Sequence, residues 1–356
     1  MTADTTLARF REYMVGPSRF MTLLSTFELG IVDRLRETPG LTAAQLGKAV
    51  GAKPDAVEQL LLLLVKESFI AYDEKSGAYR LDELADVAES DLRRALAYMN
   101  LIKVTALRQL FYLTDSVRTG TTVGLRELYG VDGTLYDAVA DHQDLRDGWS
   151  KLMDTVTANI DPWFFGNVDI PAGARVLDLA GNTGLGAIHT YRHKASERLR
   201  VTTFDLPEKE EECLANFTAH GLEEHCSFIG GNVFDGIPEG FDTVLIKHFL
   251  DMFDKDDVLR ILGGVHKSLT PGGTVHILVP VYPENIKDTD NYNVDFFPAF
   301  FIGAAMGQGG PQKLSTYQSW LEEAGFKVTQ AITKDSSEIP PDVIPVQAIL
   351  SATKVA

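Results

Sequence analysis

The chain is poor in cysteine, in basic residues and in long apolar segments. Its 356 residues include only Cys213 and Cys226, which excludes a disulfide framework and a zinc site built on paired cysteines. The 50 acidic residues outweigh the 33 lysines and arginines, and a net charge of −17 argues against nucleic acid or an anionic membrane as the main partner. Apolar runs stay below the roughly 18 residues of a membrane helix, and no charged-then-apolar leader opens the chain. We therefore expect a cytoplasmic protein with no nucleic-acid and no membrane partner.

The first part of the chain has the pattern of a winged helix. An amphipathic helix is predicted over 17–37, a short helix with a capping box over 42–50, and a third helix with an early proline over 54–67. Two short strands over 69–81 flank a polar turn and predict a β-hairpin. The third helix carries more acids than bases and would repel phosphate. Packing or dimerisation is therefore expected here rather than DNA binding.

The second half of the chain alternates strands with helices. Residues 83–165 before it read as mostly helical, with breaks at Gly120, Gly124, Gly130 and Gly133. The predicted strands cover 176–180, 201–205, 226–230, 243–247 and 274–280, followed by a helix over 316–324 and a last strand within 343–354. Parallel-type strands joined by crossover helices imply an α/β fold with a doubly wound, Rossmann-like sheet.

The most informative motif lies at the end of the first of these strands. A buried strand containing Asp178 runs into a Gly-x-x-Gly turn at Gly181 and Gly184, and Asp205 ends the next strand. Such glycines let the backbone approach a nucleoside, and the second acid accepts hydrogen bonds from the two ribose hydroxyls. A dinucleotide site would instead prefer Gly-x-Gly-x-x-Gly. The acid at 178 suits a ligand with an ammonium and a sulfonium group, which indicates S-adenosylmethionine. An ordinary strand–turn–helix connection is the alternative.

Five motifs, which include the two strand ends just described, resemble those of the S-adenosylmethionine-dependent small-molecule O-methyltransferases of the plant caffeic-acid type and the bacterial anthracycline and mitomycin type. The motifs are Val176–Asp178, Phe204–Pro207, Gly230–Phe234, Leu245–His248 and Leu269–Gly273. The resemblance implies a class I methyltransferase that forms a homodimer and acts on a small-molecule acceptor. It divides the chain into a winged-helix dimerisation domain at 1–105 (all-helical apart from its hairpin), a linker with substrate-pocket helices at 106–165 and a Rossmann-like cofactor domain at 166–356.

Carried over by position, the resemblance also implies the cofactor-binding residues. They are Asp178, Gly181, Asn182 and Gly184 around the methionine end, Asp205 and Leu206 at the ribose and adenine, Asn232 and Val233 beside the adenine, and Lys247 in the same pocket. The family usually has aspartate where this chain has Asn232. Its side-chain carbonyl can still accept a hydrogen bond from the adenine amino group.

The chain departs from the family at the general base. Relatives read Lys-His-x-Leu-His-Asp-Trp where this chain has Asp251 in place of the second histidine, and their base-orienting glutamate is Pro311 here. An ordinary Asp lies about six pKa units below a phenol, so complete proton transfer would be about 8 kcal/mol uphill, and burial narrows this gap. Asp251 and His248 are the catalytic candidates. A helix cap at Asp251 stays open as an alternative, whereas a metal held by both together with Asp295 is not favoured.

The segment 293–310 is rich in phenylalanine and glycine and predicts the wall of a pocket for an aromatic or polyketide-like acceptor. The expected acceptor contacts are Met153, Trp163, Phe164, Phe249, Phe297, Phe300, Phe301 and Met306. Ordinary core packing is the alternative. Since the usual base is absent, the sequence favours C- or N-methylation somewhat over O-methylation. A non-methylating reaction that uses the cofactor charge, such as hydroxylation, decarboxylation or a pericyclic rearrangement, is a second possibility, and a ligand-responsive regulator a third.

Overall fold

The structure is a computed structural model that describes residues 3–287, 291–335, 338–340, 343 and 345–355, without the side chains of 3, 150–152 and 154–155. The chain divides into two compact units, residues 1–100 and 101–356. Within the described part of the chain, no helix is both long and apolar enough to cross a membrane. The predicted three-part division at 105 and 165 stays a prediction.

The first unit begins with two helices where the sequence predicted one. Helix α1 (Ala3–Glu28) and helix α2 (Ile31–Glu37) are separated at Gly30, whose φ of +74° suits glycine and stops the first helix. The prediction of a single helix over 17–37 was therefore wrong. Helix α3 (Ala43–Val50) begins with the predicted capping box, in which Gln45 N donates to Thr42 Oγ1 and Thr42 N to Gln45 Oε1.

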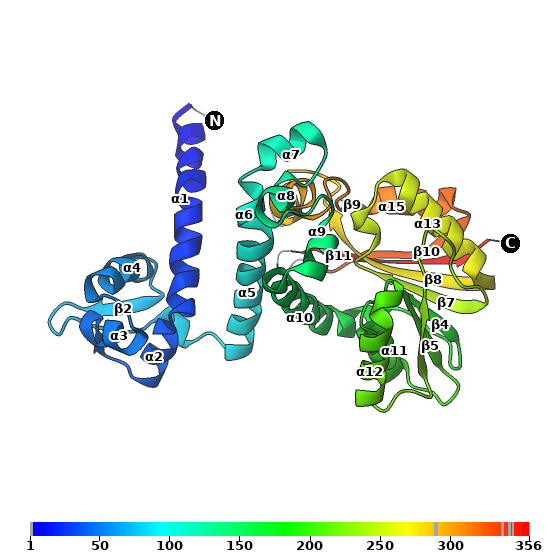
Figure 1. The fold of residues 1–356 in the computed structure, drawn as a ribbon, viewed down its shortest axis with the longest axis horizontal. Coiled ribbons are helices and arrows are strands. Elements are labelled where there is room, and N and C mark those ends of the chain that lie inside the picture. The colour runs from blue at the N-terminus through cyan, green and yellow to red at the C-terminus, as the bar shows by residue number, and fades with distance from the viewer. Residues whose placement is uncertain (1–2, 288–290, 336–337, 341–342, 344, 356) are drawn as a thin grey trace. The chain divides into compact units, whose positions relative to one another are not determined.

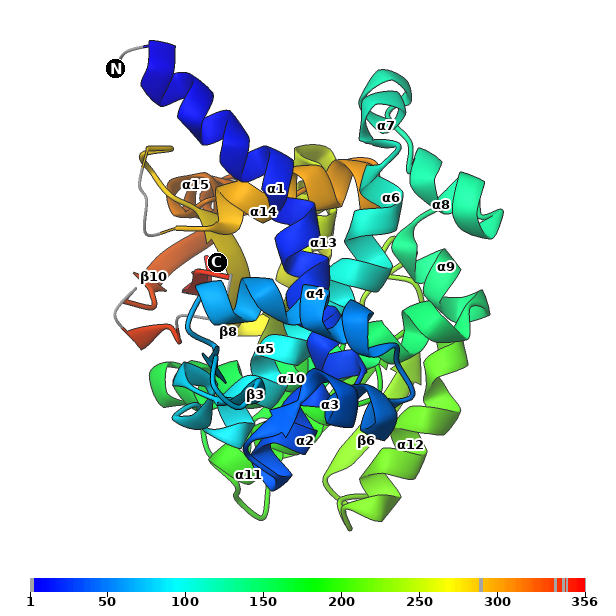
Figure 2. The ribbon, with the colours of Figure 1, turned by 90° about the vertical axis from the view of Figure 1, so that its left-hand side faces the viewer.

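The rest of the first unit completes the winged helix. Helix α4 (Pro54–Lys66) precedes the predicted antiparallel hairpin of β2 (Ile70–Asp73) and β3 (Ala78–Leu81). A third strand, β1 (Leu41–Thr42), pairs with β3 and is too short to have been predicted. Helices α2 to α4 gather at the carboxyl-terminal part of α1, whose amino-terminal part extends beyond them (Figures 1 and 2). That extension exposes the large side chains of Leu7, Phe10, Tyr13 and Met14.

A run of helices opens the second unit. Helix α5 (Glu89–Leu101) belongs to the first unit except for its last residue. After it come the π-helical turn η2 (Ile102–Leu107), α6 (Arg108–Leu110), α7 (Leu113–Thr119), α8 (Val123–Tyr129), α9 (Leu135–Asp141) and α10 (Gln143–Asn167). Gly120 and Gly130 end α7 and α8 in the left-handed conformation, as their predicted roles as breaks require. The predicted break at Gly124 was wrong. This residue lies inside α8, where a Cβ would come within 2.6 Å of the Gln109 backbone, so glycine serves close helix packing there.

One eight-stranded sheet organises the remainder of the second unit, with strand order β10-β11-β8-β7-β4-β5-β6 and β9 paired to β8. The strands are β4 (Arg175–Leu179), β5 (Arg200–Asp205), β6 (Cys226–Gly230), β7 (Phe241–Lys247), β8 (Leu269–Tyr282), β9 (Gln312–Lys313), β10 (Phe326–Thr333) and β11 (Gln347–Lys354). The helices between them are α11 (Leu185–Lys194), α12 (Glu210–Ala219), α13 (Lys255–Ser268), α14 (Asn293–Phe300) and α15 (Leu314–Glu323). The five predicted strands are present and parallel. Strands β10 and β11 add an antiparallel edge, of which β10 was not predicted.

Alternating side chains bury both faces of this sheet. Val176 faces the core formed with α10, α11 and α12, whereas Leu177 and Leu179 face α13 and α15. Figure 1 shows these two helical layers on opposite sides of the strands. The chain leaves β4 toward β5 on one side and returns as β7 on the other. Ligands of such sheets bind outside the carboxyl ends of the strands where the order reverses, so β4, β5 and β7 position the candidate site.

Candidate cofactor and acceptor site

The turn after β4 forms a cradle around a buried carboxylate. Asp178 is 1% exposed, and its Oδ2 has no hydrogen-bond partner among the described residues. A Cβ on Gly181 or on Gly186 would collide with this carboxylate, so both positions require glycine. Burial raises the pKa of Asp178 to about 6, partly opposed by the positive charge of Lys247. A buried acid that lacks a partner fits the ammonium group of a methionine-like ligand.

Asp205, at the carboxyl end of β5, is already oriented for a diol. One carboxylate oxygen accepts the backbone N–H of Asn182 at 2.7 Å, and the other accepts that of Leu206 at 2.7 Å. A carboxylate has about four lone-pair sites, so each oxygen can still accept one hydroxyl proton. Burial raises the pKa of Asp205, and the two N–H donors oppose this shift. The arrangement fits the two hydroxyls of a ribose.

Three further predicted residues lie at the neighbouring strand ends. Leu206 is 42% exposed directly after β5, so its apolar side chain is free to cover a flat base. Asn232 follows β6, and its Oδ1 accepts the backbone N–H of Phe234 at 2.9 Å. This bond fixes the side chain and leaves a second lone pair on Oδ1. Val233 packs at the edge of the core below β7.

Lys247 ends β7 and is held by an acid that the sequence did not single out. Its Nζ lies 3.1 and 3.4 Å from the two carboxylate oxygens of Asp161 on α10. His189 on α11 meets the same carboxylate, with Nδ1 2.6 Å from Oδ2. The ammonium group also lies over the rings of Phe164 and Phe165, 5.9 and 5.5 Å from their centroids. Helix α10 thus holds the lysine side chain, and His189 on α11 holds the acid that pairs with it.

Asp251 lies beyond β7 in the short 3₁₀ turn η4 (Leu250–Met252), and it is not a helix cap. The following helix α13 has Asp254 at its N-cap, where the side chain accepts the backbone N–H of Asp257 at 3.0 Å. Asp251 is instead 6% exposed, and its Oδ1 is buried without a hydrogen-bond partner in the described part of the chain. Burial raises the pKa of its carboxyl to about 7. The cap alternative is therefore wrong, and a titratable carboxyl stands at this position.

A glycine turn contacts the backbone of Asp251, and the charge of its carboxyl acts on nearby tyrosines. Gly310 N donates to the backbone oxygen of Asp251 at 2.8 Å, and a Cβ on Gly310 would lie 3.3 Å from the hydroxyl of Tyr282. Burial, followed by the charge of Asp251, raises the pKa of Tyr282 to about 12. The same two causes raise the pKa of Tyr317 well above its ordinary value. Both tyrosines therefore stay neutral and can donate hydrogen bonds.

His248 is neutral and strained. Burial and the nearby Lys247 lower its pKa to about 4, and its buried Nε2 makes no hydrogen bond to the described residues. Its φ of +52° is unusual for a residue with a Cβ, as are those of Ala180 and Asn182 at the glycine turn. Backbone strain of this kind is concentrated at functional sites. Asp295 is exposed on α14, and the described residues contain no group of three or more potential metal ligands.

The predicted acceptor residues separate into two groups and two single residues. Phe297, Phe300, Phe301 and Met306 pack in one apolar cluster that also contains Met252, next to Asp251. Trp163 and Phe164 belong to the core around α10, where Phe164 is fully buried under Lys247. Phe249 contacts Phe253 edge to face, at 5.0 Å between ring centroids, and Met153 is half-buried on α10. The structure thus brings four of the eight into one cluster with Met252, the neighbour of Asp251, and leaves the roles of all eight as predictions.

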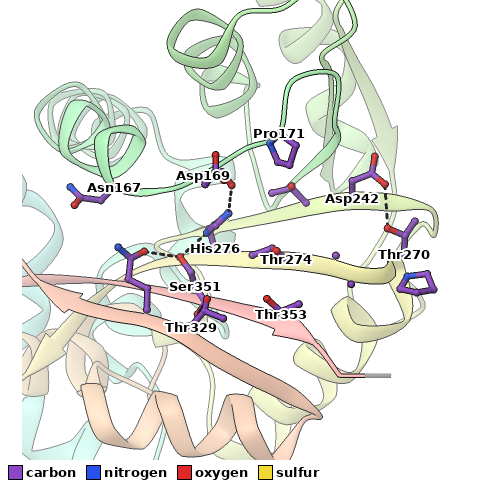
Figure 3. A pocket seen from close by; sticks show the side chains of 15 residues that line it. Asn167, Asp169, Pro171, Asp242, Thr270, Thr274, His276, Thr329, Ser351 and Thr353 are labelled. Carbon is purple, nitrogen blue, oxygen red and sulfur yellow. Dashed lines mark hydrogen bonds between the residues drawn. The ribbon is translucent and has the colours of Figure 1, made fainter.

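The sequence missed Asp161, His189, Tyr282 and Tyr317. None carries a local signal, because Asp161 and Lys247 are separated by 86 positions and meet only through the packing of α10 against the sheet. A separate polar cavity of about 670 Å³ lies at the opposite, amino-terminal ends of the parallel strands (Figure 3). Its lining includes the buried His276 and Ser351 and none of the site residues described above. The cavity therefore takes no part in the candidate site.

Comparison with known proteins agrees with this geometry. The O-methyltransferase domain model matches residues 110–327, and the O-methyltransferase dimerisation domain model matches residues 12–89. The 3-amino-4-hydroxybenzoate 4-O-methyltransferase of Streptomyces cremeus is 25% identical over 337 residues, which cover 93% of this chain and 88% of that protein. The mitomycin biosynthesis 6-O-methyltransferase of Streptomyces lavendulae is 27% identical over 316 residues, covering 86% and 84%.

A solved structure extends the agreement to the fold. Human N-acetylserotonin methyltransferase in complex with S-adenosylmethionine is similar over 100% of both chains, with a TM-score of 0.77 at 21% identity. The cradle at Asp178 and the diol acceptor at Asp205 fit the same cofactor. The chain therefore belongs to the O-methyltransferase family, as an S-adenosylmethionine-dependent small-molecule methyltransferase of specialised metabolism.

Proposed function

We propose that this enzyme methylates a hydroxyl group of an aromatic or polyketide-like small molecule, with Asp251 as the proton acceptor. The observation that carries the proposal is the carboxyl of Asp251, which is buried and has one oxygen without a partner in the described residues. It lies beside the apolar cluster that holds Phe297 and Phe301. When bound, S-adenosylmethionine supplies an electrophilic methyl group on its sulfonium.

The energetics of proton transfer support an oxygen acceptor. With the pKa of Asp251 at about 7, the carboxyl lies about 3 units below a phenol, and complete proton transfer costs about 4 kcal/mol. A histidine with an ordinary pKa would face about 5 kcal/mol. Burial therefore brings the base strength of this aspartate into the range of an ordinary histidine. The energetic argument for C- or N-methylation is therefore weaker, and the two O-methylating relatives support an oxygen acceptor.

Asp251 and the neighbouring side chains have different roles in the proposed reaction. Asp251 removes the proton of the acceptor hydroxyl as the new bond to the methyl group forms. Tyr282 and Tyr317, whose raised pKa values keep them protonated, orient the acceptor by donating hydrogen bonds. Phe297, Phe300 and Met306 supply the apolar wall against which a flat ring packs.

The test is a product analysis. Purified enzyme is incubated with S-adenosylmethionine and a panel of hydroxybenzoates, catechols and hydroxylated quinones, and the products are analysed by mass spectrometry and NMR. We expect an O-methyl ether and one S-adenosylhomocysteine for each turnover. A methyl group on carbon or nitrogen would overturn the choice of acceptor atom, and turnover without S-adenosylhomocysteine would overturn methyl transfer itself.

We further propose that the enzyme is a homodimer in the cytoplasm. The dimerisation domain match and the exposed apolar residues of α1, among them Phe10 and Met14, support the assembly. Cys213 and Cys226, both free and buried, suit a reducing compartment. Light scattering is expected to give twice the 39.1 kDa mass of the chain. A monomer at micromolar concentration would refute the assembly.

A further inference from the structure

The cofactor site contains Lys247, whose positive charge would weaken the binding of a positively charged ligand unless another group compensated it. S-adenosylmethionine carries positive charge on both its sulfonium and its ammonium group. Lys247 ends β7, whose residue Leu245 is paired directly with Asp178 on β4. The charge of Lys247 reaches Asp178, where it opposes the rise in pKa that burial causes. An uncompensated ammonium group at this place would repel the cofactor.

Asp161 supplies the compensation at close range. Its side chain is 2% exposed and that of Lys247 is 11% exposed, so water screens this ion pair poorly. Both carboxylate oxygens lie within 3.4 Å of Nζ. The rings of Phe164 and Phe165 below the ammonium group limit the directions in which it can move.

The carboxyl of Asp161 is ionised despite its burial. Burial by itself would raise its pKa, but the hydrogen bond to His189 and the interactions with Lys247 hold the pKa below its ordinary value. A carboxylate can only accept, so Nδ1 of His189 is the donor of the 2.6 Å hydrogen bond. His189 thereby fixes the carboxylate that faces Lys247.

We infer that Asp161 is a positioning residue that cancels the charge of Lys247 and so removes a repulsion that would weaken the sulfonium cofactor more than its thioether product. The product, S-adenosylhomocysteine, has lost the positive charge on sulfur. Its sulfur atom is therefore insensitive to whether Asp161 cancels the charge of Lys247. Charge compensation therefore acts on the cofactor and its product unequally. The inference rests on the cofactor alone and is independent of the acceptor and of Asp251.

Asp161→Asn tests the inference because it keeps the size of the side chain and removes its charge. Unit charges about 8 Å apart, at an effective dielectric constant of about 20 to 40, change an affinity roughly five- to thirtyfold. Titration calorimetry on the full chain is therefore expected to show S-adenosylmethionine weakened by that factor more than S-adenosylhomocysteine. A matched control is Asp242→Asn, which removes a carboxylate paired with Arg175 at the other end of the same strand. It should change neither affinity.

A second variant gives the opposite sign and guards against misfolding of the first. Lys247→Met leaves the Asp161 carboxylate in place and removes the cation, so the ratio of the two affinities is expected to shift toward S-adenosylmethionine. In the double variant Asp161→Asn, Lys247→Met, the ratio should return to about that of the wild type. Equal weakening of both ligands by Asp161→Asn, or a Lys247→Met ratio that shifts toward S-adenosylhomocysteine, would overturn the inference. Methyl transfer and its acceptor can be right or wrong independently of this result.

Discussion

Replacing Asp251 by asparagine separates the chemical role of this carboxyl from its structural surroundings. The substitution keeps the shape of the side chain in the turn η4 and removes its ability to take a proton. General-base catalysis contributes about 10²- to 10⁴-fold to a rate. We therefore expect kcat to fall by about that factor, while the affinity for S-adenosylmethionine is retained because the cofactor residues are untouched.

The pH dependence of the wild-type rate follows from the same group. With the pKa of Asp251 at about 7, the base is half protonated near neutrality. The rate is expected to rise with pH through about 7 and then level off. The asparagine side chain of the Asp251→Asn variant does not titrate, so its residual rate should lack this rise.

Loss of a helix cap would lower the stability of the fold. Because the carboxyl of Asp251 is buried, we expect Asp251→Asn to raise the stability at pH 8 instead. The pKa of Asp251 is raised on folding from 3.8 to about 7, so its contribution to stability is fully present below pH 3.8 and is lost as the pH rises through 7. The size of this loss is at most about 4 kcal/mol. At pH 8 the Asp251→Asn variant should thus melt at a higher temperature than the wild type, and near pH 4 the two should be similar.

Asp254→Ala is the control, because it removes the N-cap of α13 three residues away. It is expected to cost about 1 kcal/mol of stability and to leave the rate unchanged. Activity is measured by release of S-adenosylhomocysteine, and stability by thermal melting at pH 4 and pH 8. Full activity of Asp251→Asn together with a lower melting temperature at pH 8 would refute the reasoning.

Three other substitutions test the rest of the site and the core. Asp205→Ala should abolish S-adenosylmethionine binding, measured by calorimetry, and leave the fold intact. An affinity within about threefold of the wild type would contradict its role, because even a tenfold loss corresponds to only about 1.4 kcal/mol of binding free energy. Gly181→Ala should weaken the same binding at least about tenfold, because the new Cβ displaces the Asp178 carboxylate. His276 is buried, and burial lowers its pKa to about 4. Its contribution to stability is therefore present above about pH 6.5 and is lost, by up to about 3 kcal/mol, as the pH falls through 4; urea unfolding of His276→Gln should show less of this acid sensitivity.

The sequence predicts those features that depend on neighbouring residues. The capping box at Thr42, the glycine turn after β4 and the acid that ends β5 are local patterns, and the structure contains all three. The winged helix and the parallel sheet follow from alternation and period, which are also local. The break at Gly30 was missed because the apolar positions on both sides keep one helical period across it.

Features that depend on contacts between distant segments could not be predicted from the sequence. The role of Asp161 exists only where α10 crosses the end of β7. The raised pKa of Asp251 comes from burial under residues far along the chain, so the sequence alone supports only the ordinary pKa of an aspartate. Strand β10 is an edge strand with half-exposed side chains, and a shift of register between Val328 and Gln330 interrupts its alternation of apolar and polar residues.

The hydrogen bond between Gly310 and Asp251 has a consequence for redesign of the enzyme. The apolar segment that begins in α14 ends at this glycine turn, so the proposed wall of the acceptor pocket and the proposed base are joined through a few backbone atoms. A larger acceptor that displaces the wall would also tilt the carboxyl and slow the reaction. We therefore expect substrate range and rate to change together, and mutational libraries should keep Gly309 and Gly310 fixed while they vary the phenylalanines.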